Sequence, residues 1–237
     1  MKVISLWSGP RNVSTALMYS FAQRPDTLVI DEPLYAHYLA KVNVDHPGRE
    51  EVLLAMDADG QRVLESILSK NYHRPIIFLK NMAHHWRNID HALLKPMQHL
   101  FLIRDPREML PSLANQLPNP VLRDTGLDIQ KKLLEEISLF QDQIPVINAR
   151  ELLTHPESIL KKTCDMLNIK YYKEMLSWNE GPRPEDGIWA KYWYKNVHQS
   201  NGFEPYTPKN QPFPAHLTDT LNESIPYYNH LYQHALK

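Results

Sequence analysis

Residues 3–21 read Val3-Ile4-Ser5-Leu6-Trp7, then Ser8-Gly9-Pro10-Arg11-Asn12-Val13-Ser14-Thr15, then Ala16-Leu17-Met18-Tyr19-Ser20-Phe21. The first run is apolar and has the length of a buried strand, and the last has a helical pattern. Between them, Gly9 and Pro10 mark a tight turn. A strand, a tight turn and a helix in direct succession predict the first unit of an α/β fold.

Four further apolar runs have the length of buried strands: Leu28 to Ile30, Ile76 to Leu79, Leu100 to Ile103 and Val146 to Asn148. Helix-period segments lie between many of them. Leu127, Ile129, Leu133, Leu134, Ile137 and Phe140 fall mostly on one helix face. Another helix start is predicted at Thr154, where Pro156 and Glu157 complete a capping-box pattern. This alternation predicts an α/β fold with a doubly wound parallel sheet.

Composition limits the function classes. The chain has 237 residues, of which 43% are hydrophobic and 22% charged, with a formal net charge of −1. Nucleic acid and anionic membrane are therefore not expected as partners. Cys164 is the only cysteine, and neither a signal peptide nor a membrane span is apparent, so we expect a cytoplasmic protein. We expect one domain over residues 1–237, with 178–237 as an irregular wrap or lid rich in Pro, Asn, Tyr and Trp.

The turn after the first strand is a candidate anion site. Unpaired N–H groups and the positive end of the helix dipole point outward at such a helix start, and Arg11 adds a fixed charge. The loop lacks the Gly-Lys-Ser/Thr of a nucleotide-kinase loop, because Val13 precedes Ser14. The alternative is a plain helix cap, with Ser14 and Thr15 as terminal hydroxyls and Arg11 in solvent.

A second candidate anion site follows the strand Leu100 to Ile103. Arg104 stands at the carboxyl end of that strand, where open α/β sheets bind ligands. Asp105 and Pro106 predict a helix start, and Ser112 lies eight residues after Arg104. The guanidinium and the hydroxyl could grip one phosphate. The alternative is a surface ion pair between Arg104 and Asp105, worth ~0–1 kcal/mol.

Together the two motifs resemble those of the sulfotransferase superfamily. Its members place a 5′-phosphosulfate loop after the first strand, commonly Pro-Lys-Ser-Gly-Thr-Thr, and a later strand ends in Arg with Ser eight positions on for the 3′-phosphate. Pro10 to Thr15 and Arg104 with Ser112 match this in order, spacing and strand context. Val146 to Glu157 is similar to the family's strand, acidic-Leu pair and Pro-capped helix.

The resemblance covers scattered motifs over about residues 2–168 and implies a three-layer, P-loop-like fold. It also implies 3′-phosphoadenosine-5′-phosphosulfate (PAPS) as co-substrate, held by Gly9, Pro10, Arg11, Asn12, Val13, Ser14, Thr15, Arg104 and Ser112, with no metal. Three departures stand out. Arg11 replaces the loop Lys, Val13 replaces the loop Gly, and the C-terminal Arg-Lys-Gly of many members is absent. Substitutes for the missing 3′-phosphate contacts are sought in Lys191, Lys195, His198 and Ser200.

Sulfuryl transfer also needs a base for the acceptor's proton. Glu32, which ends a strand before Pro33, resembles the glutamate base of several branches and is our first candidate. Cytosolic members carry Lys-Thr-His after a later strand. Here Lys80 matches the Lys as a charge near the transferring group, but Met82 occupies the His position, so His84 or His85 would have to reach in. The spacing of the histidines argues against a zinc site.

The expected function is therefore transfer of a sulfuryl group from PAPS to a hydroxyl or amine of a small molecule. Two alternatives remain open at this point: a P-loop kinase-like enzyme that uses Mg-ATP, and a non-catalytic nucleotide-binding descendant. Residues 37–59 and 178–213 are expected to shape the acceptor pocket. Neither the acceptor nor the oligomeric state, a homodimer included, follows from the sequence.

Overall fold

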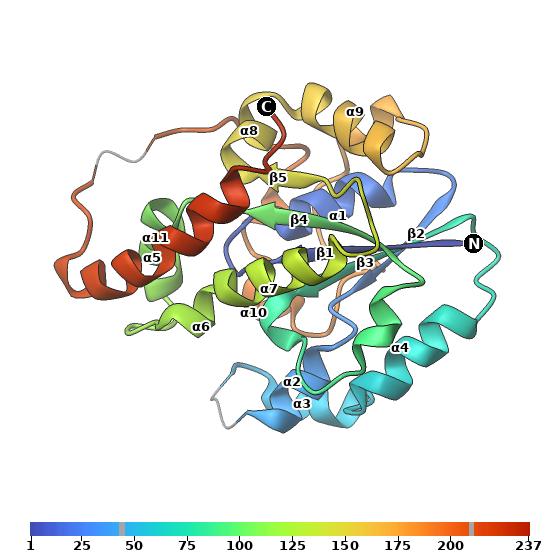
Figure 1. Cartoon of the computed structure of the whole chain (residues 1–237), viewed down its shortest axis with the longest axis horizontal. Helices are drawn as coiled ribbons and strands as arrows, with labels where there is room; N and C mark the ends of the chain where they lie inside the picture. Colours follow the sequence, from blue (N-terminus) through green and yellow to red (C-terminus); the bar gives the residue numbers. More distant parts are fainter. Residues whose placement is uncertain (43–45, 209–210) are drawn as a thin grey trace.

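A parallel sheet forms the centre of the computed structural model, which describes residues 1–42, 46–208 and 211–237 (Figure 1). All five predicted strands are confirmed. Their order across the sheet is β2-β3-β1-β4-β5, with every neighbouring pair parallel. The strands are β1 Lys2–Ser8, β2 Thr27–Asp31, β3 Ile76–Met82, β4 Gln98–Ile103 and β5 Val146–Asn148. Because all are parallel, their carboxyl ends share one edge, at which Ser8 pairs with Met82 and Asp31 with Lys80.

Helices cover both faces of the sheet, as the doubly wound prediction requires. One face packs against α4 Gly60–Ser69, α5 Pro106–Ala114, α7 Leu127–Ile137 and α11 Thr218–Tyr232. The other face packs against α1 Ser14–Ala22, α8 Ala149–Thr154, α9 Pro156–Met166 and the short η3 Lys173–Leu176. The three-layer arrangement is therefore confirmed. It arises because successive side chains of a strand point to opposite faces and both must be buried.

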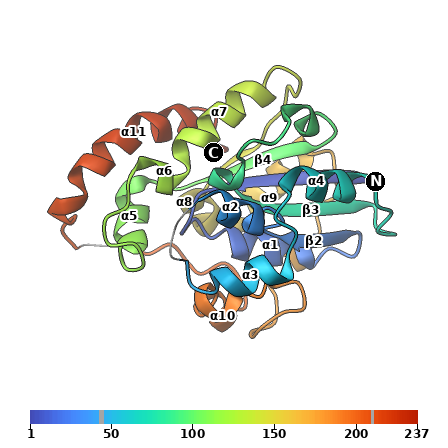
Figure 2. The ribbon, with the colours of Figure 1, turned by 90° about the horizontal axis from the view of Figure 1, so that it is seen from below.

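A third apolar cluster lies at the carboxyl edge of the sheet. It joins α2 Tyr35–Lys41 and α3 Arg49–Ala55 to α10 Ala190–Trp193 (Figure 2). The remaining short helices are α6 Leu122–Thr125, η1 Ala83–His85, η2 His91–Leu94, η4 Val197–Gln199 and η5 Ala215–Leu217. Segments about 150 residues apart in sequence thus meet above the strand ends.

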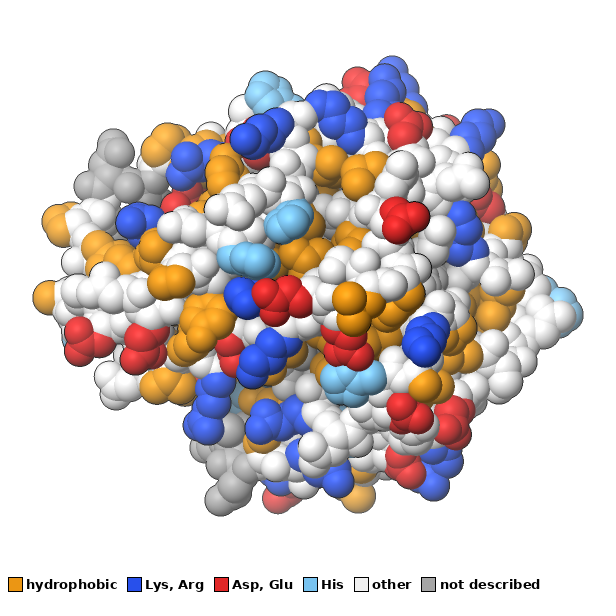
Figure 3. Space-filling view, in the orientation of Figure 1, with side chains coloured by type: hydrophobic (Ala, Val, Ile, Leu, Met, Phe, Trp, Pro, Cys, Tyr) orange, Lys and Arg blue, Asp and Glu red, His pale blue; other side chains and the backbone are white. Residues whose placement is uncertain are grey.

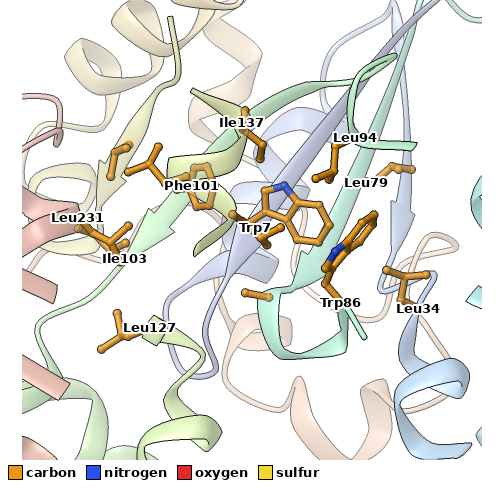
Figure 4. Close-up of a cluster of buried hydrophobic side chains, with 14 of the residues drawn as sticks. Trp7, Leu34, Leu79, Trp86, Leu94, Phe101, Ile103, Leu127, Ile137 and Leu231 are labelled. Atoms are coloured by element: carbon orange, nitrogen blue, oxygen red, sulfur yellow. The ribbon is translucent and has the colours of Figure 1, made fainter. Parts of the chain in front are cut away.

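Two tryptophans, Trp7 and Trp86, pack in the apolar core between the sheet and α7, which is the usual role of this residue type. Trp7 and Trp86 meet edge to face with ring centroids 5.4 Å apart (Figure 4). The Trp7 indole N–H donates to His99 Nδ1 at 3.0 Å, and His99 Nε2 lies 2.9 Å from the Leu94 carbonyl oxygen. Burial lowers the pKa of His99 to about 4, which keeps this imidazole neutral.

Both predicted helix starts are confirmed, but only one of the two predicted caps is correct. Asp105 caps α5 by accepting from the Arg107 backbone N–H, and Pro106 follows it. Thr154, in contrast, is the last residue of α8, and its hydroxyl donates to the Arg150 carbonyl oxygen at 2.8 Å. No side chain of the described residues caps α9, which begins at Pro156. Because the Thr154 side chain is hydrogen-bonded within α8, it does not cap α9.

The C-terminal region combines an irregular segment with a helix that the sequence analysis missed. The described stretches 178–208 and 211–214 run mostly without regular structure, and the helices within them are the short α10 and η4. Afterwards α11 packs beside α7 (Figure 1). Leu236 N–H donates to the Val146 carbonyl oxygen, which ties the chain end to the edge strand. The irregular extension is thus confirmed only up to α11.

The molecular surface agrees with the near-neutral composition. On the face shown in Figure 3, acidic and basic side chains lie interspersed rather than gathered by sign. Within the described ranges, no helix is both long enough and apolar enough to cross a bilayer.

Candidate active site

The turn between β1 and α1 has an unusual backbone. Arg11 and Val13 both adopt left-handed conformations, with φ of 59° and 58°. Such turns curve successive N–H groups around a common point and are used to bind anions. Gly9 is required by close packing, since a Cβ there would lie 2.3 Å from the Thr125 carbonyl oxygen. Among the described residues no side chain caps α1, so the plain-cap alternative is not what this helix start shows.

The two predicted anion motifs meet in space although they lie more than 90 residues apart. Arg11 Nε donates to Ser112 Oγ at 3.0 Å, and Arg104 Nη1 donates to the Arg11 carbonyl oxygen at 2.8 Å. Burial, and then the charge of Arg104, lower the pKa of Arg11. The nearest carboxylate to Arg104 is Glu108, with Nε and Oε2 3.5 Å apart, so the alternative pair with Asp105 does not form. Two neighbouring guanidinium groups favour an anion between them.

A cavity of about 780 Å³ opens at this edge of the sheet. Its size is that of a pocket for a small organic ligand. Nearly all of the predicted site residues line it: Pro10, Arg11, Asn12, Val13, Ser14, Thr15, Glu32, Lys80, His84, Arg104 and Ser112. Gly9 is not among the lining residues and lies behind the loop against Thr125. The cavity therefore joins the two anion motifs to the proposed base.

Glu32 and Lys80 form a buried cluster with Asp31 at the tips of β2 and β3. Lys80 Nζ donates to Asp31 Oδ1 at 2.9 Å and to Glu32 Oε1 at 2.6 Å. Of the two carboxylates, Glu32 lines the cavity, whereas Asp31 is not among the lining residues. Glu32 also has a left-handed backbone, with φ of 39°. Such strain in a non-glycine residue is typical of functional sites.

The ionisation of this cluster follows from its charges. Burial raises the pKa of Glu32; the attraction of Lys80 opposes this rise and the charge of Asp31 adds to it. Burial alone would lower the pKa of Lys80, but Asp31 and Glu32 outweigh it, so the pKa lies well above the usual value. The ammonium group therefore stays charged, while the Glu32 carboxyl is a better proton acceptor than an exposed one.

His84 and His85 follow β3 in η1 and both line the cavity. Burial lowers the pKa of His84 to about 3 and that of His85 well below its usual value, so both rings are neutral. His85 Nδ1 lies 4.0 Å from Glu32 Oε2. Neither Nδ1 atom has a hydrogen-bond partner among the described residues. A buried unpaired ring nitrogen beside a carboxylate is suited to contact a bound polar group.

Aromatic residues that the sequence analysis did not assign form the wall beyond Glu32. They are Tyr35, Tyr38, Trp189, Tyr192, Trp193 and Tyr194. The Tyr35 and Tyr38 rings stack on His85 with centroids 5.1 Å and 4.6 Å away. No sequence motif marks Tyr35 or Tyr38 as site residues. The other four lie in the Trp- and Tyr-rich stretch 189–194, whose composition was a signal that could have identified them.

Both segments that were expected to shape an acceptor pocket line this cavity. Tyr38, His46 and Pro47 come from the first, and Trp189, Tyr192, Trp193 and Tyr194 are among those from the second. Residues 43–45 and 209–210 of these segments lie outside the described residues. Of the four suggested substitutes for the missing C-terminal motif, Ser200 lines the cavity. Lys191 instead pairs with Glu51 and His198 with Asp186, and Lys195 is not among the lining residues.

The fold and the site together define an α/β protein with a P-loop-like anion turn. The family model described as "Sulfotransferase domain" matches residues 1–235. The chain therefore belongs to the sulfotransferase domain family, as the sequence motifs predicted.

Solved structures agree on the fold. The sulfotransferase from Alicyclobacillus acidocaldarius has a TM-score of 0.59 and 12% identity, with 98% of this chain and 95% of that chain covered. The sulfotransferase domain from the curacin biosynthetic pathway has a TM-score of 0.58 and 16% identity, covering 95% and 98%. At such low identity these similarities establish architecture, and they confirm the predicted fold class.

Two curated relatives from Arabidopsis thaliana are more similar in sequence. Branched-chain-amino-acid aminotransferase-like protein 1 is 39% identical over 236 residues, which is 98% of this chain and 42% of the relative. Branched-chain-amino-acid aminotransferase-like protein 2 is 37% identical over 235 residues, also 42% of its length. The chain thus spans less than half the length of these relatives.

Proposed function

We propose that this protein transfers a sulfuryl group from PAPS to a hydroxyl or amine of a small molecule. The observation that carries the proposal is the junction of Arg11, Arg104 and Ser112 on the wall of one cavity that also contains Glu32. The family membership supports the same reaction. The near-neutral charge and the size of the cavity support a small-molecule acceptor rather than a polyanion.

The donor nucleotide is assigned to the half of the cavity with the guanidinium groups. In this proposal the turn Pro10–Thr15 holds the 5′-phosphosulfate, because its N–H groups and the start of α1 attract an anion. Arg104 and Ser112 hold the 3′-phosphate. Both side chains line the cavity, and each contacts Arg11, so the two phosphate subsites are adjacent.

The proposed transfer does not require a metal ion. The acceptor oxygen or nitrogen forms a bond to sulfur while the bond between sulfur and the bridging phosphate oxygen breaks. The acceptor's proton passes to Glu32, and the leaving phosphate keeps the electron pair. Arg11 and the start of α1 stabilise the developing negative charge, and preorganised donors of this kind supply a few kcal/mol.

Arg11 in place of the family's Lys changes one detail of this mechanism. A guanidinium stays charged at all relevant pH values, so Arg11 stabilises the leaving oxygen by electrostatics and does not protonate it. Its contact with Ser112 fixes the direction of the guanidinium group. The product nucleotide is then released as the phosphate anion.

Calorimetric titration with adenosine 3′,5′-bisphosphate tests the donor assignment without an acceptor. We expect binding that exceeds the affinity for ADP with or without Mg²⁺, and Arg104→Ala should abolish it. Arg107→Ala is the matched control, since Arg107 follows Arg104 closely in the chain, in the first turn of α5, and pairs with Asp105 outside the cavity. Absence of bisphosphate binding, or an equal preference for Mg-ADP, would overturn the assignment in favour of a kinase-like enzyme.

Transfer from ³⁵S-labelled PAPS to a panel of phenols, alcohols and amines tests the chemistry. Glu32→Gln should retain bisphosphate affinity and lose turnover by about 10²–10⁴, the usual contribution of a general base. A fully active Glu32→Gln enzyme would move the base to His84 or His85. Tight nucleotide binding with no transfer to any acceptor would instead indicate a non-catalytic descendant.

A further inference from the structure

A tyrosine from the C-terminal segment completes the charged cluster at the strand tips. The Tyr194 hydroxyl accepts a hydrogen bond from Lys80 Nζ at 2.6 Å and donates one to Asp31 Oδ2 at 2.7 Å. It also receives the Trp189 indole N–H at 3.2 Å. Tyr194 and Asp31 are 163 positions apart in the sequence. The contact therefore depends on how the segment after Trp178 lies across the strand ends.

Together these contacts use the full donor capacity of Lys80. An ammonium group has three N–H donors, and here they go to Asp31 Oδ1, Glu32 Oε1 and the Tyr194 oxygen. Asp31 is satisfied as well, because its Oδ2 accepts from both Tyr194 and the Gly187 N–H. Asp31 thus serves as a fully bonded counter-ion.

Glu32 is held differently from Asp31. Lys80 binds its Oε1, while Oε2 lies 4.0 Å from the unpaired Nδ1 of His85, another residue that lines the cavity. Its N–H donates to the Lys80 carbonyl oxygen at 2.8 Å, which fixes the backbone. The direction of the free oxygen therefore depends on where Lys80 sits, and that depends on the balance between Asp31 and Tyr194.

Stability alone is a weak reason for such a cluster. A buried ion pair is often no more stable than apolar residues of the same volume, because the charges lose their hydration. Tyr194, Lys80 and Glu32 all line the cavity, so the cluster forms part of the wall of the site. A charged network in which Lys80 and Asp31 are fully bonded and Glu32 keeps one oxygen free is suited to orient a reacting group at that place.

We propose that Tyr194 is a positioning residue: its hydroxyl holds Lys80 between the two carboxylates and so keeps one Glu32 oxygen directed at the acceptor. This inference rests on the proposed function, in which Glu32 is the base. It adds that the irregular C-terminal segment completes the catalytic centre as well as covering it.

Titration of the Glu32 carboxyl by ¹³C NMR tests this role without donor or acceptor. The groups that face Glu32 are Lys80, Asp31, His85, Tyr35 and Tyr194. In Tyr194→Phe, Asp31 loses a donor and draws Lys80 away from Glu32. The Glu32 titration should therefore move to higher pH than in the wild type. Glu32→Gln identifies the signal by its disappearance.

Tyr228→Phe is the matched control, because Tyr228 is also buried and its hydroxyl accepts from Asn148 Nδ2, away from the cavity. It should leave the Glu32 titration unchanged. An unshifted Glu32 signal in folded Tyr194→Phe, or the same shift in Tyr228→Phe, would overturn the proposal.

A second variant covers the case in which Tyr194→Phe does not fold. Trp189→Phe removes the indole N–H that fixes the Tyr194 hydroxyl, and we expect a smaller shift in the same direction. No shift, or a shift to lower pH, would count against the role. Because these readouts need no nucleotide, their outcome is independent of whether PAPS is the donor.

Discussion

Val13 in a left-handed conformation offers a sharp test of the anion turn. Its φ is 58° and its ψ 23°, and it stands at the N-terminal cap of α1, where related loops carry glycine. A β-branched residue is a genuine outlier in this region. Position 13 should therefore prefer glycine to alanine, which reverses the preference of an ordinary helix position.

The magnitude follows from two opposing terms. The left-handed conformation costs an L-residue roughly 1–2 kcal/mol. Glycine lacks this strain but loses about 0.5–1 kcal/mol more conformational entropy than alanine on folding. Val13→Gly should thus be more stable than Val13→Ala by roughly 0.5–1 kcal/mol, the difference between the central values of these two terms. Both variants lose the contacts of the half-buried Val13 side chain, so their difference isolates the backbone.

Urea unfolding at pH 7 measures both free energies. The control pair is Ser66→Gly and Ser66→Ala, since Ser66 is exposed in the interior of α4. There alanine should be the more stable variant by about 0.5–1 kcal/mol. If Val13→Ala equals or exceeds Val13→Gly in stability, the turn is not held in the left-handed conformation and the reasoning about its N–H groups fails.

Two further predictions concern buried ionisable groups. Lys80→Met should lower the free energy of unfolding by about 3–5 kcal/mol at pH 8, because two buried carboxylates lose their shared cation. The loss should be smaller at pH 5, where protonation of a carboxylate relieves the repulsion between them. A loss of the same size at both pH values would contradict this. Burial lowers the pKa of His99 from its usual 6.5 to about 4 in the folded protein. The unfolded chain therefore binds the proton first, so stability should fall as pH drops from 6.5 to 4, by up to about 3 kcal/mol. His99→Gln should show a shallower fall over that interval in the same urea assay, and an unchanged slope would refute the linkage.

Local sequence patterns were sufficient for the scaffold of the site. The five strands, the turn after β1 and the start of α5 depend on apolar runs, Gly-Pro punctuation and an Asp-Pro cap. These signals act between residues close in the chain. Parallel strands then bring Arg11, Glu32, Lys80 and Arg104 to one edge as a matter of topology.

Other features followed from no local pattern. Helix α11 was missed because its mostly polar sequence contains Pro226 and has only a weak apolar periodicity. The cap at Thr154 was predicted wrongly because Thr154 is the last residue of α8 and its hydroxyl donates to the Arg150 carbonyl oxygen within that helix. In both cases the packing of neighbouring elements outweighed the local signal.

The amino-acid sequence by itself determined which residues stand at the strand ends and what charge each carries, because strands and helix starts are coded by neighbours. Only the tertiary structure decided that Arg11 grips Ser112, that Asp31 is bonded on both oxygens while Glu32 keeps one free, and that Tyr194 reaches Lys80. Those contacts join segments about 50 to 160 residues apart. The Lys80 contacts depend on the register of β2 and β3. The Tyr194 contacts depend on the path of an irregular segment, which has no periodic signature in the sequence.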